Sequence, residues 1–294
     1  MALNIKQVGL CFAGEVSGLD LTKPLSREEV LAIHAGMDQF AVLFFRGPKL
    51  SNDQHMAFTK RLGDVEQAIG TSLREPKDHR LSTDFADVSN LDKDERPFER
   101  EDRRRLFTIG NRLWHSDSSF KPTPAKYSIL HAHAIPTKGG NTEYADMRAA
   151  YEALDDEMKD LVEDLICEHS QLYSRGKIGF TDFTDEERKR FEPVRQVMVR
   201  RHPVTGRKSL YLSSHAGGIV GWPVPEARIF LQDLAEHATQ RQFVHAHEWQ
   251  IGDLVIWDNR QTMHRARPFP DEQPRDMRRT TLAGDGPTVA QIRR

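Results

Sequence analysis

The sequence predicts a mostly β protein with flanking helices, whose core is a β-sandwich or jelly roll. Many short strand-like segments are separated by turns that contain Gly or Pro. These strands do not alternate regularly with helices, as they would in a doubly wound α/β protein. We expect residues 1–294 to form a single domain, because no internal repeat or low-complexity linker divides the chain.

Each expected element depends on a local pattern. Phe40–Phe45 (FAVLFF) is a continuous apolar run, typical of a strand buried on both faces. Ser26–Glu29 and Ser51–Gln54 resemble capping boxes and predict helices that continue to about Asp38 and Leu62. The other expected strands cover residues 5–8, 13–16, 127–134, 194–201, 209–213, 244–249, 254–257 and 277–283, and the other helices 147–166, with a break near 155–156, and 225–239.

Residues 71–109 differ in character from the rest of the chain. They are polar and charge-dense, with one strand-like patch at 86–91. One interpretation is a solvated excursion that is partly disordered. The other is a lid or insertion over a site, since long loops in compact domains are often functional.

Composition and charge limit the partners. The net charge of −2 argues against nucleic acid, whose recognition needs a basic excess. Cys11 and Cys167 are the only cysteines, too few for a disulfide framework or a closed thiolate zinc site. No apolar run approaches the roughly 18–20 residues of a membrane helix, and the N-terminus lacks the order of a signal peptide. We therefore expect a cytoplasmic protein with no membrane partner.

A possible metal site comes from three residues. His115 and Asp117, in NRLWHSDSSF, are two residues apart and would point to the same face of an extended segment. His264 follows a strongly apolar strand near the C-terminus and offers a third ligand. Two nitrogens and one oxygen with open positions suit iron(II) oxygenases. His131 and His133 have the same spacing, but we interpret them as ordinary strand residues.

Arginines follow His264 on a predicted strand. Arg275, Met277 and Arg279 would share one face of that strand, and Arg278 would lie on the other. If this face lines a cavity, two guanidinium groups point inward, and each fits a carboxylate. The pattern indicates two bound carboxylates, one on a cosubstrate and one on a substrate. A surface strand with salt-bridged arginines is the alternative.

The chain resembles the taurine and 2,4-dichlorophenoxyacetate dioxygenase family, and most closely its phenoxyacetate-type members. The resemblance extends from VLFFRGPKLSNDQ to RRTTL. Its most specific blocks are NRLWHSDSSF, GGNTEYADMRAAYEAL, HAGGIVG, EHATQRQFVHAHEW and GDLVIWDNRQTMHRA. It implies a double-stranded β-helix (jelly-roll) core, Fe(II), O2 and the cosubstrate 2-oxoglutarate.

The resemblance also implies roles for single residues. His115, Asp117 and His264 would be the iron ligands. Thr142 and Arg275 would bind 2-oxoglutarate. Arg279, His215 and Asn111 would bind the primary substrate, although a structural turn role for Asn111 stays open. We expect Trp257 and Asp258, like Trp114, to pack and to support the ligands.

The implied reaction is hydroxylation of a small carboxylate-bearing substrate, as in the degradation of aromatic compounds. An aryloxyacetate such as 2,4-dichlorophenoxyacetate would give a phenol and glyoxylate, with succinate and CO2. The same chemistry on taurine, an alkyl sulfate or an arylpropionate is the alternative. A zinc hydrolase or a non-catalytic jelly-roll binding protein is more distant, because neither explains paired inward arginines. We expect a homo-oligomer.

Overall fold

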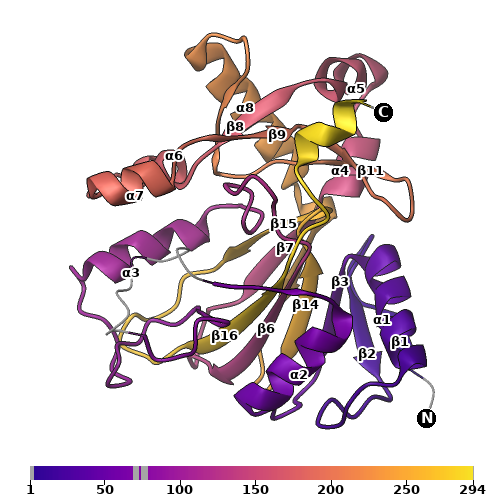
Figure 1. Ribbon diagram of the computed structural model, residues 1–294, viewed down its shortest axis with the longest axis vertical. Coiled ribbons are helices and arrows are strands. Elements are labelled where there is room, and N and C mark those ends of the chain that lie inside the picture. Colours follow the sequence, from indigo (N-terminus) through magenta and orange to yellow (C-terminus); the bar gives the residue numbers. More distant parts are fainter. Residues whose placement is uncertain (1–2, 69–72, 74–78, 294) are drawn as a thin grey trace.

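The computed structural model describes residues 3–68, 73 and 79–293 of the chain. Its largest sheet has eight strands and occupies the lower part of the molecule in Figure 1. The strand order is β1-β2-β3-β14-β6-β16-β4, and β5 pairs separately with β16. These strands are β1 (Asn4–Gln7), β2 (Gly14–Ser17), β3 (Val42–Phe45), β4 (Val65–Glu66), β5 (Ala86–Asp87), β6 (Tyr127–Ala134), β14 (Leu254–Asp258) and β16 (Asp276–Leu282).

A second sheet, in the order β13-β7-β15, lies against the first. Its strands are β7 (Thr142–Asp146), β13 (Val244–His247) and β15 (Thr262–Ala266), and both pairings are antiparallel. The chain moves between the sheets from β6 to β7, and again from β13 through β14 and β15 to β16. This alternation is that of a jelly roll and confirms the predicted fold class.

The core explains why the large sheet is buried on both faces. On β3, Val42 and Phe44 pack with Tyr144 and Trp257 between the two sheets. Leu43 lies on the opposite face, in a cluster that includes side chains of α1 (Arg27–Phe40) and α2 (Asn52–Leu62). Each such buried side chain contributes about 1.5–3 kcal/mol through burial. The apolar run around β3 therefore has two layers to fill, as predicted.

Both predicted capping boxes are present. The Ser26 hydroxyl accepts from the Glu29 backbone N–H, and Glu29 accepts from the Ser26 N–H. Ser51 and Gln54 make the same exchange at the start of α2. These bonds satisfy N–H groups that have no partner inside the helix.

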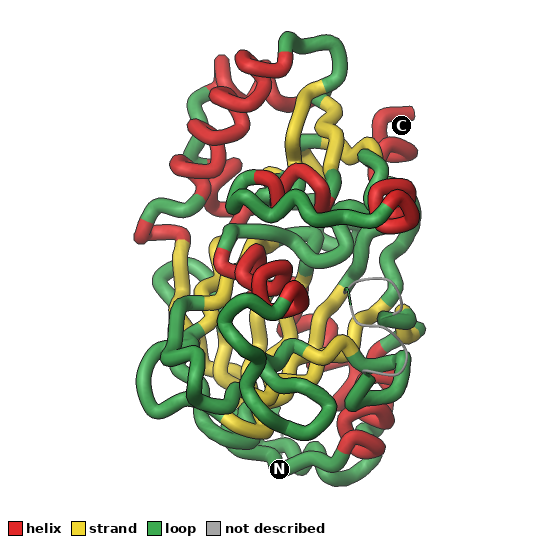
Figure 2. The backbone as a smooth tube through the Cα atoms, turned by 90° about the vertical axis from the view of Figure 1, so that its left-hand side faces the viewer, coloured by secondary structure: helices red, strands yellow, loops and turns green. Residues whose placement is uncertain are grey.

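The upper part of Figure 1 contains most of the remaining helices, with β8, β9 and β12 as a small sheet and β10–β11 as a hairpin. Figure 2 shows loops covering the strands on the side where α3 lies. These elements are α3 (Arg103–Thr108), η2 (Ile109–Arg112), α4 (Met147–Glu152), α5 (Asp156–Glu163), β8 (Ile166–His169), α6 (Gln171–Gly176), α7 (Asp185–Arg190), β9 (Val194–Val197), β10 (Val199–Arg201), β11 (Lys208–Leu210), β12 (Ala216–Ile219), α8 (Val224–Ala238), η3 (Arg241–Phe243) and η4 (Thr288–Arg293).

The structure corrects some predicted elements. The expected strand 194–201 is interrupted at Met198, so that β9 pairs with β8 while β10 pairs with β11. The patch 86–91 contains only the two-residue strand β5. The expected break in the helix 147–166 is present at 153–155, but the second helix ends at Glu163 and Ile166 begins β8. In the described part of the chain, no helix has the length and apolar character to cross a membrane.

Candidate active site

The two candidate histidine ligands lie opposite each other across a short backbone pairing. His115 donates its N–H to the carbonyl of His264 (3.0 Å), and His264 donates in return (2.8 Å). Side chains of such paired residues are close neighbours, and the two ring centroids are 4.2 Å apart. The Asp117 carboxylate lies 3.9 Å from His115 Nε2 and 3.8 Å from His264 Nε2. The structure thus brings together all three residues predicted from the sequence.

The protonation of these residues suits a cation. His115 Nδ1 lies 2.8 Å from the Leu113 carbonyl, which makes Nδ1 the donor and leaves the Nε2 lone pair free. Burial lowers the pKa of His115, and lowers that of His264 further below its usual value, so both rings are neutral. One ligand atom from each of the three residues lies within 4.8 Å of the others, and no other such group occurs in the described residues. Two neutral imidazoles and one carboxylate fit Fe(II).

Asp117 is held by three groups. Ser128 on β6 donates to Oδ2 (2.7 Å), and Arg279 on β16 donates to Oδ1 (2.5 Å). The Asp117 backbone N–H donates to the Asn259 side-chain oxygen (3.1 Å). Burial alone would raise the pKa of the Asp117 carboxyl, but the Arg279 guanidinium, together with the hydrogen bond from Ser128, outweighs it and holds that pKa well below its usual range. The carboxylate is therefore charged and oriented.

Asn259 is a supporting residue that the sequence analysis missed. Its side-chain oxygen also accepts from the Trp257 indole (3.0 Å), and its amide donates to Ser128 (3.0 Å). It is completely buried at the end of β14. An amide that accepts and donates at once can connect Trp257, Ser128 and Asp117. In the sequence, only its position between Asp258 and the segment that contains His264 could have indicated this supporting role.

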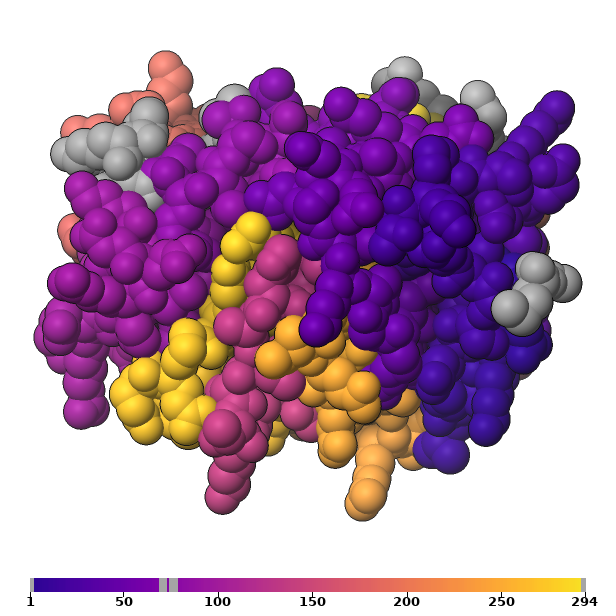
Figure 3. Space-filling view, turned by 90° about the horizontal axis from the view of Figure 1, so that it is seen from below, coloured from indigo at the N-terminus to yellow at the C-terminus, as the bar shows by residue number. Residues whose placement is uncertain are grey.

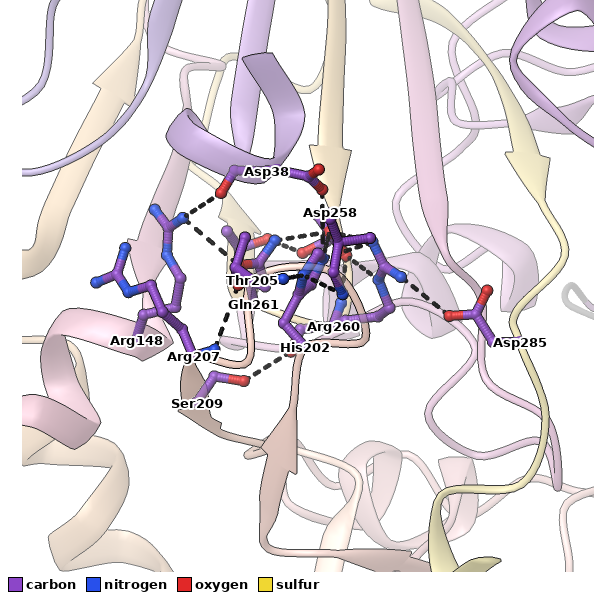
Figure 4. A network of polar contacts seen from close by, with 12 residues as sticks. Asp38, Arg148, His202, Thr205, Arg207, Ser209, Asp258, Arg260, Gln261 and Asp285 are labelled. Carbon is purple, nitrogen blue, oxygen red and sulfur yellow. Dashed lines mark hydrogen bonds and ion pairs between the residues drawn. The ribbon is translucent and has the colours of Figure 1, made fainter. Parts of the chain in front are cut away.

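The turn that leads from β14 to His264 is fixed by a polar network (Figure 4). Asp258 has no exposed surface and accepts from Arg260 Nε (2.9 Å) and Nη2 (2.8 Å) and from Gln261 (2.8 Å). Arg260 also donates to Asp285 (2.9 Å) and lies 2.8 Å from His202 Nε2. The expected supporting role of Asp258 is thus exerted on the turn that precedes β15.

A pocket opens beside the three candidate ligands. His115, Asp117, Arg275 and Arg279 all line it. Arg278 does not, and instead donates to Asn52 (2.9 Å) and Asp276 (2.9 Å). The predicted division of these arginines between two faces is confirmed, even though the pairing register shifts between Asp276 and Met277.

Arg275 is a buried cation without a carboxylate partner among the described residues. The hydrogen bonds of its side chain go to two backbone carbonyls, those of Val88 (3.4 Å) and Gly140 (3.5 Å), and its Nε has no hydrogen-bond partner. Its Cζ also lies 5.7 Å from the centroid of the Phe269 ring. Burial lowers the pKa of Arg275 to about 10, so the guanidinium is still charged at neutral pH. Such a group requires an anion.

The other predicted residues lie around this pocket. Thr142 is buried on β7, two residues after Gly140, and its hydroxyl oxygen accepts from the Trp249 indole (3.0 Å). It is not among the residues that line the pocket. His215 and Asn111 do line it. His215 lies near a ligand, with its ring centroid 6.0 Å from that of His115.

Residues 79–109 supply one side of the pocket. Arg80 pairs with Asp87 (3.0 Å) and Asp276 (3.0 Å), which fixes this segment against β16. Phe85 and Val88 line the pocket from the same segment. In Figure 3 the chain near residue 100 lies opposite the indigo N-terminal part, with yellow, magenta and orange segments between them. The positions 71–72 and 74–78 of the predicted lid lie outside the described residues.

A jelly roll that presents two histidines and one aspartate beside a pocket defines the class of non-haem iron dioxygenases. The chain belongs to the family described as taurine catabolism dioxygenase TauD, TfdA family, whose model matches residues 4–281. It is therefore an enzyme of the dioxygenase class, as the resemblance implied.

Two sequence relatives and one solved structure are similar to this chain over nearly its whole length. The chain is 42% identical to a 2,4-dichlorophenoxyacetate dioxygenase of Cupriavidus pinatubonensis that depends on α-ketoglutarate, over 93% of this chain and 95% of the relative. It is 36% identical to an (S)-phenoxypropionate/α-ketoglutarate dioxygenase of Delftia acidovorans, over 96% and 95%. A crystal structure of AAD-2 in complex with Mn(II) and N-oxalylglycine is 55% identical and has a TM-score of 0.96, with 98% of this chain and 100% of AAD-2 covered.

Proposed function

We propose that this protein is an Fe(II)- and 2-oxoglutarate-dependent dioxygenase that hydroxylates an aryloxyacetate. The observation that carries the proposal is that His115 and Asp117, two of the three candidate ligands, line the same pocket as Arg275, whose guanidinium has no carboxylate partner among the described residues. A metal site alone fits many enzymes. A metal site beside a buried arginine that lacks a carboxylate fits a cosubstrate with a distant carboxylate, as 2-oxoglutarate has.

His115, Asp117 and His264 hold the iron, and Arg275 pairs with the distal carboxylate of 2-oxoglutarate. Thr142 accepts from Trp249, so its own hydroxyl hydrogen is free to donate to the same carboxylate. Fe(II), when bound, would supply the redox chemistry of this site: O2 is reduced, and 2-oxoglutarate is oxidised to succinate and CO2. Hydrogen-bond donors in fixed positions take the place of water around the reacting groups, and the burial of the site excludes bulk water.

The lining of the pocket favours an aromatic substrate. Apolar surface among the charged groups of the lining comes from Phe85, Val88, Ile109, Phe120 and Phe269. An aryloxyacetate has both parts, an aryl ring and a carboxylate. One oxygen atom of O2 enters succinate and the other hydroxylates the ether carbon. The resulting hemiacetal breaks its C–O bond to release a phenol and glyoxylate.

The test is a panel assay with purified enzyme, Fe(II) and 2-oxoglutarate. With 2,4-dichlorophenoxyacetate we expect succinate and phenol in equal amounts, and no turnover when Fe(II) or 2-oxoglutarate is omitted. Sulfite released from taurine, or sulfate from an alkyl sulfate, in preference to phenol would overturn the substrate assignment. Activity with Zn(II) and without 2-oxoglutarate would overturn the reaction class.

We also propose that the enzyme is cytoplasmic and forms a homo-oligomer. Residues 79–109 are proposed to cover its pocket. Cys11 and Cys167 are both free thiols, which suits a reducing compartment. Val220, Val224 and Ile229 expose apolar side chains at and before α8, where a second copy can bury them. Light scattering after size-exclusion chromatography tests the oligomer, and a monomer at micromolar concentration would contradict it.

A further inference from the structure

Residues 117–121 form a short loop that leads from the candidate ligand Asp117 into the wall of the pocket. Asp117, Ser118 and Phe120 all line the pocket. Ser118 has a φ of 55°, in the left-handed region that a residue with a Cβ seldom adopts. Such a conformation persists only where the surrounding structure fixes it. Whatever anchors this loop therefore also determines the positions of the ligand and of the wall.

Gln196, on β9, is one anchor of the loop and does not itself line the pocket. It is completely buried, and its Nε2 donates to the carbonyls of Ser119 (2.8 Å) and Lys121 (2.8 Å). These two carbonyls lie on either side of Phe120 in the chain, so that one amide group fixes the loop at two points. A primary amide has two N–H donors, and both are used here.

Thr288, in η4 near the C-terminus, sets the direction of this amide. Its hydroxyl donates to Gln196 Oε1 (2.6 Å) and accepts from the Val197 N–H (3.1 Å). A backbone N–H can only donate, so the hydroxyl hydrogen of Thr288 is left for the amide oxygen of Gln196. The NH2 group of Gln196 must then point to the loop. Thr288 is also buried, and bulk water does not compete for these bonds.

Glu66, on β4, holds the same loop through side chains. Its carboxylate accepts from the Ser118 hydroxyl (3.1 Å) and pairs with the Lys121 ammonium group. The Glu66 side chain is 17% exposed, whereas Gln196 is completely buried. Water can replace contacts at a partly exposed carboxylate, but it cannot reach the two carbonyls that Gln196 satisfies. The buried amide is therefore the stronger of the two anchors.

We propose that Gln196 is a positioning residue of the iron site, which acts through the loop 117–121 on Asp117, and that Thr288 orients its amide. The proposal rests on the proposed function, because it takes Asp117 as an iron ligand. Without the amide, the loop loses two buried hydrogen bonds and Ser118 is free to leave the left-handed region. The carboxylate of Asp117 then moves relative to the two histidines, which weakens metal binding although all three ligands are still present.

The test is metal binding to the metal-free protein in the absence of oxygen. The affinity is measured with Mn(II) by calorimetry, and the geometry of the ligands with Co(II) by its visible absorption bands. Gln196→Leu should raise the Kd of Mn(II) about tenfold, at the lower end of the effect of a partner behind a metal ligand. Thr288→Val should raise it about threefold, the effect of one neutral hydrogen bond, whereas Thr288→Ser should bind as the wild type does. Gln196→Leu and Thr288→Val should both shift the Co(II) bands.

Thr59→Val is the matched control for the loss of a buried hydroxyl. Thr59 is completely buried on α2, and its hydroxyl bonds to the His55 carbonyl (2.9 Å) and to the Thr280 hydroxyl (2.7 Å), away from the loop. This variant should lower the thermal stability as Thr288→Val does, but leave the Kd of Mn(II) and the Co(II) bands unchanged. Adding Ser118→Gly to Gln196→Leu should recover part of the metal affinity, since glycine adopts the left-handed region without strain.

Wild-type Mn(II) affinity and Co(II) bands in folded Gln196→Leu overturn the proposal, and the same result in Thr288→Val does so if Gln196→Leu does not fold. An equal loss of affinity in Thr59→Val also overturns it, because metal binding would then follow overall stability. Failure of the proposed function is distinct. In that case Asp117→Ala would bind Mn(II) as tightly as the wild type, and the wild-type enzyme would not consume O2 with Fe(II) and 2-oxoglutarate.

Discussion

Removing the Ser128 hydroxyl tests whether Asp117 depends on its support to bind iron. Ser128 is completely buried, and its Oγ donates to Asp117 Oδ2 at 2.7 Å while accepting from Asn259 at 3.0 Å. A hydrogen bond to a charged group is worth about 1.5–3 kcal/mol. Loss of a partner behind a metal ligand lowers metal affinity about 10- to 100-fold. Because Arg279 still holds the other oxygen of Asp117, we expect the lower end for Ser128→Ala, about tenfold or 1.4 kcal/mol.

The assay is titration of the metal-free protein with Mn(II) and, without oxygen, with Fe(II). Ser119→Ala is the matched control, because Ser119 is also completely buried, lies two residues from Asp117, and has no hydrogen-bond partner for its Oγ. This control should change the metal Kd by less than about twofold. Equal metal affinity in Ser128→Ala and the wild type, with unchanged thermal unfolding, would refute the reasoning that the hydroxyl orients the ligand.

Three further predictions concern the buried charges. Asp258→Asn should lower the free energy of unfolding by about 3–5 kcal/mol in urea titrations, because Arg260 loses its buried partner. The control is Asp285→Asn, at a half-exposed carboxylate, which should lower the free energy of unfolding by about 1 kcal/mol or less. Burial alone would raise the pKa of Asp258, but Arg260 outweighs it and holds this pKa well below its usual range. A folded-state pKa below the unfolded value of about 3.9 stabilises the protein fully above about pH 5 and less as the pH falls. The free energy of unfolding should thus decrease below about pH 4, and less steeply in Asp258→Asn; equal slopes would contradict this. Arg275→Gln should raise the KM for 2-oxoglutarate about tenfold in a succinate assay, whereas Arg278→Gln, which faces away from the pocket, should not; equal effects would exclude a specific role for Arg275.

The sequence predicts best what local patterns determine. The capping boxes at Ser26 and Ser51 depend on residues three positions apart, and both helices begin where predicted. The pair His115 and Asp117 is close in the chain, and a spacing of two already places both on one face. β15, which contains His264, was not predicted because its five residues have no strong apolar pattern. Its pairing with β7, over 100 residues earlier, makes it a strand.

Arg175 shows why part of the site cannot be predicted from the sequence. Its neighbours Phe107, Gly110 and Asn111 come from segments some 65 residues earlier, and His215 from one 40 residues later. No local pattern distinguishes it from the other arginines of the chain, most of which are solvated or paired. Burial without a counter-charge is the distinguishing property, and only the folded chain creates it.

The charge of the pocket links the iron site to its ligands. The sequence predicted two carboxylates from two inward arginines, Arg275 and Arg279. In the structure Arg279 donates to Asp117, the carboxylate that would also bind the iron. Arg175 is a further buried guanidinium of the same pocket and has no acidic partner in the described chain. The pocket thus carries more positive charge than Asp117 alone can balance, which agrees with the expectation of bound carboxylates, one of them that of 2-oxoglutarate at Arg275.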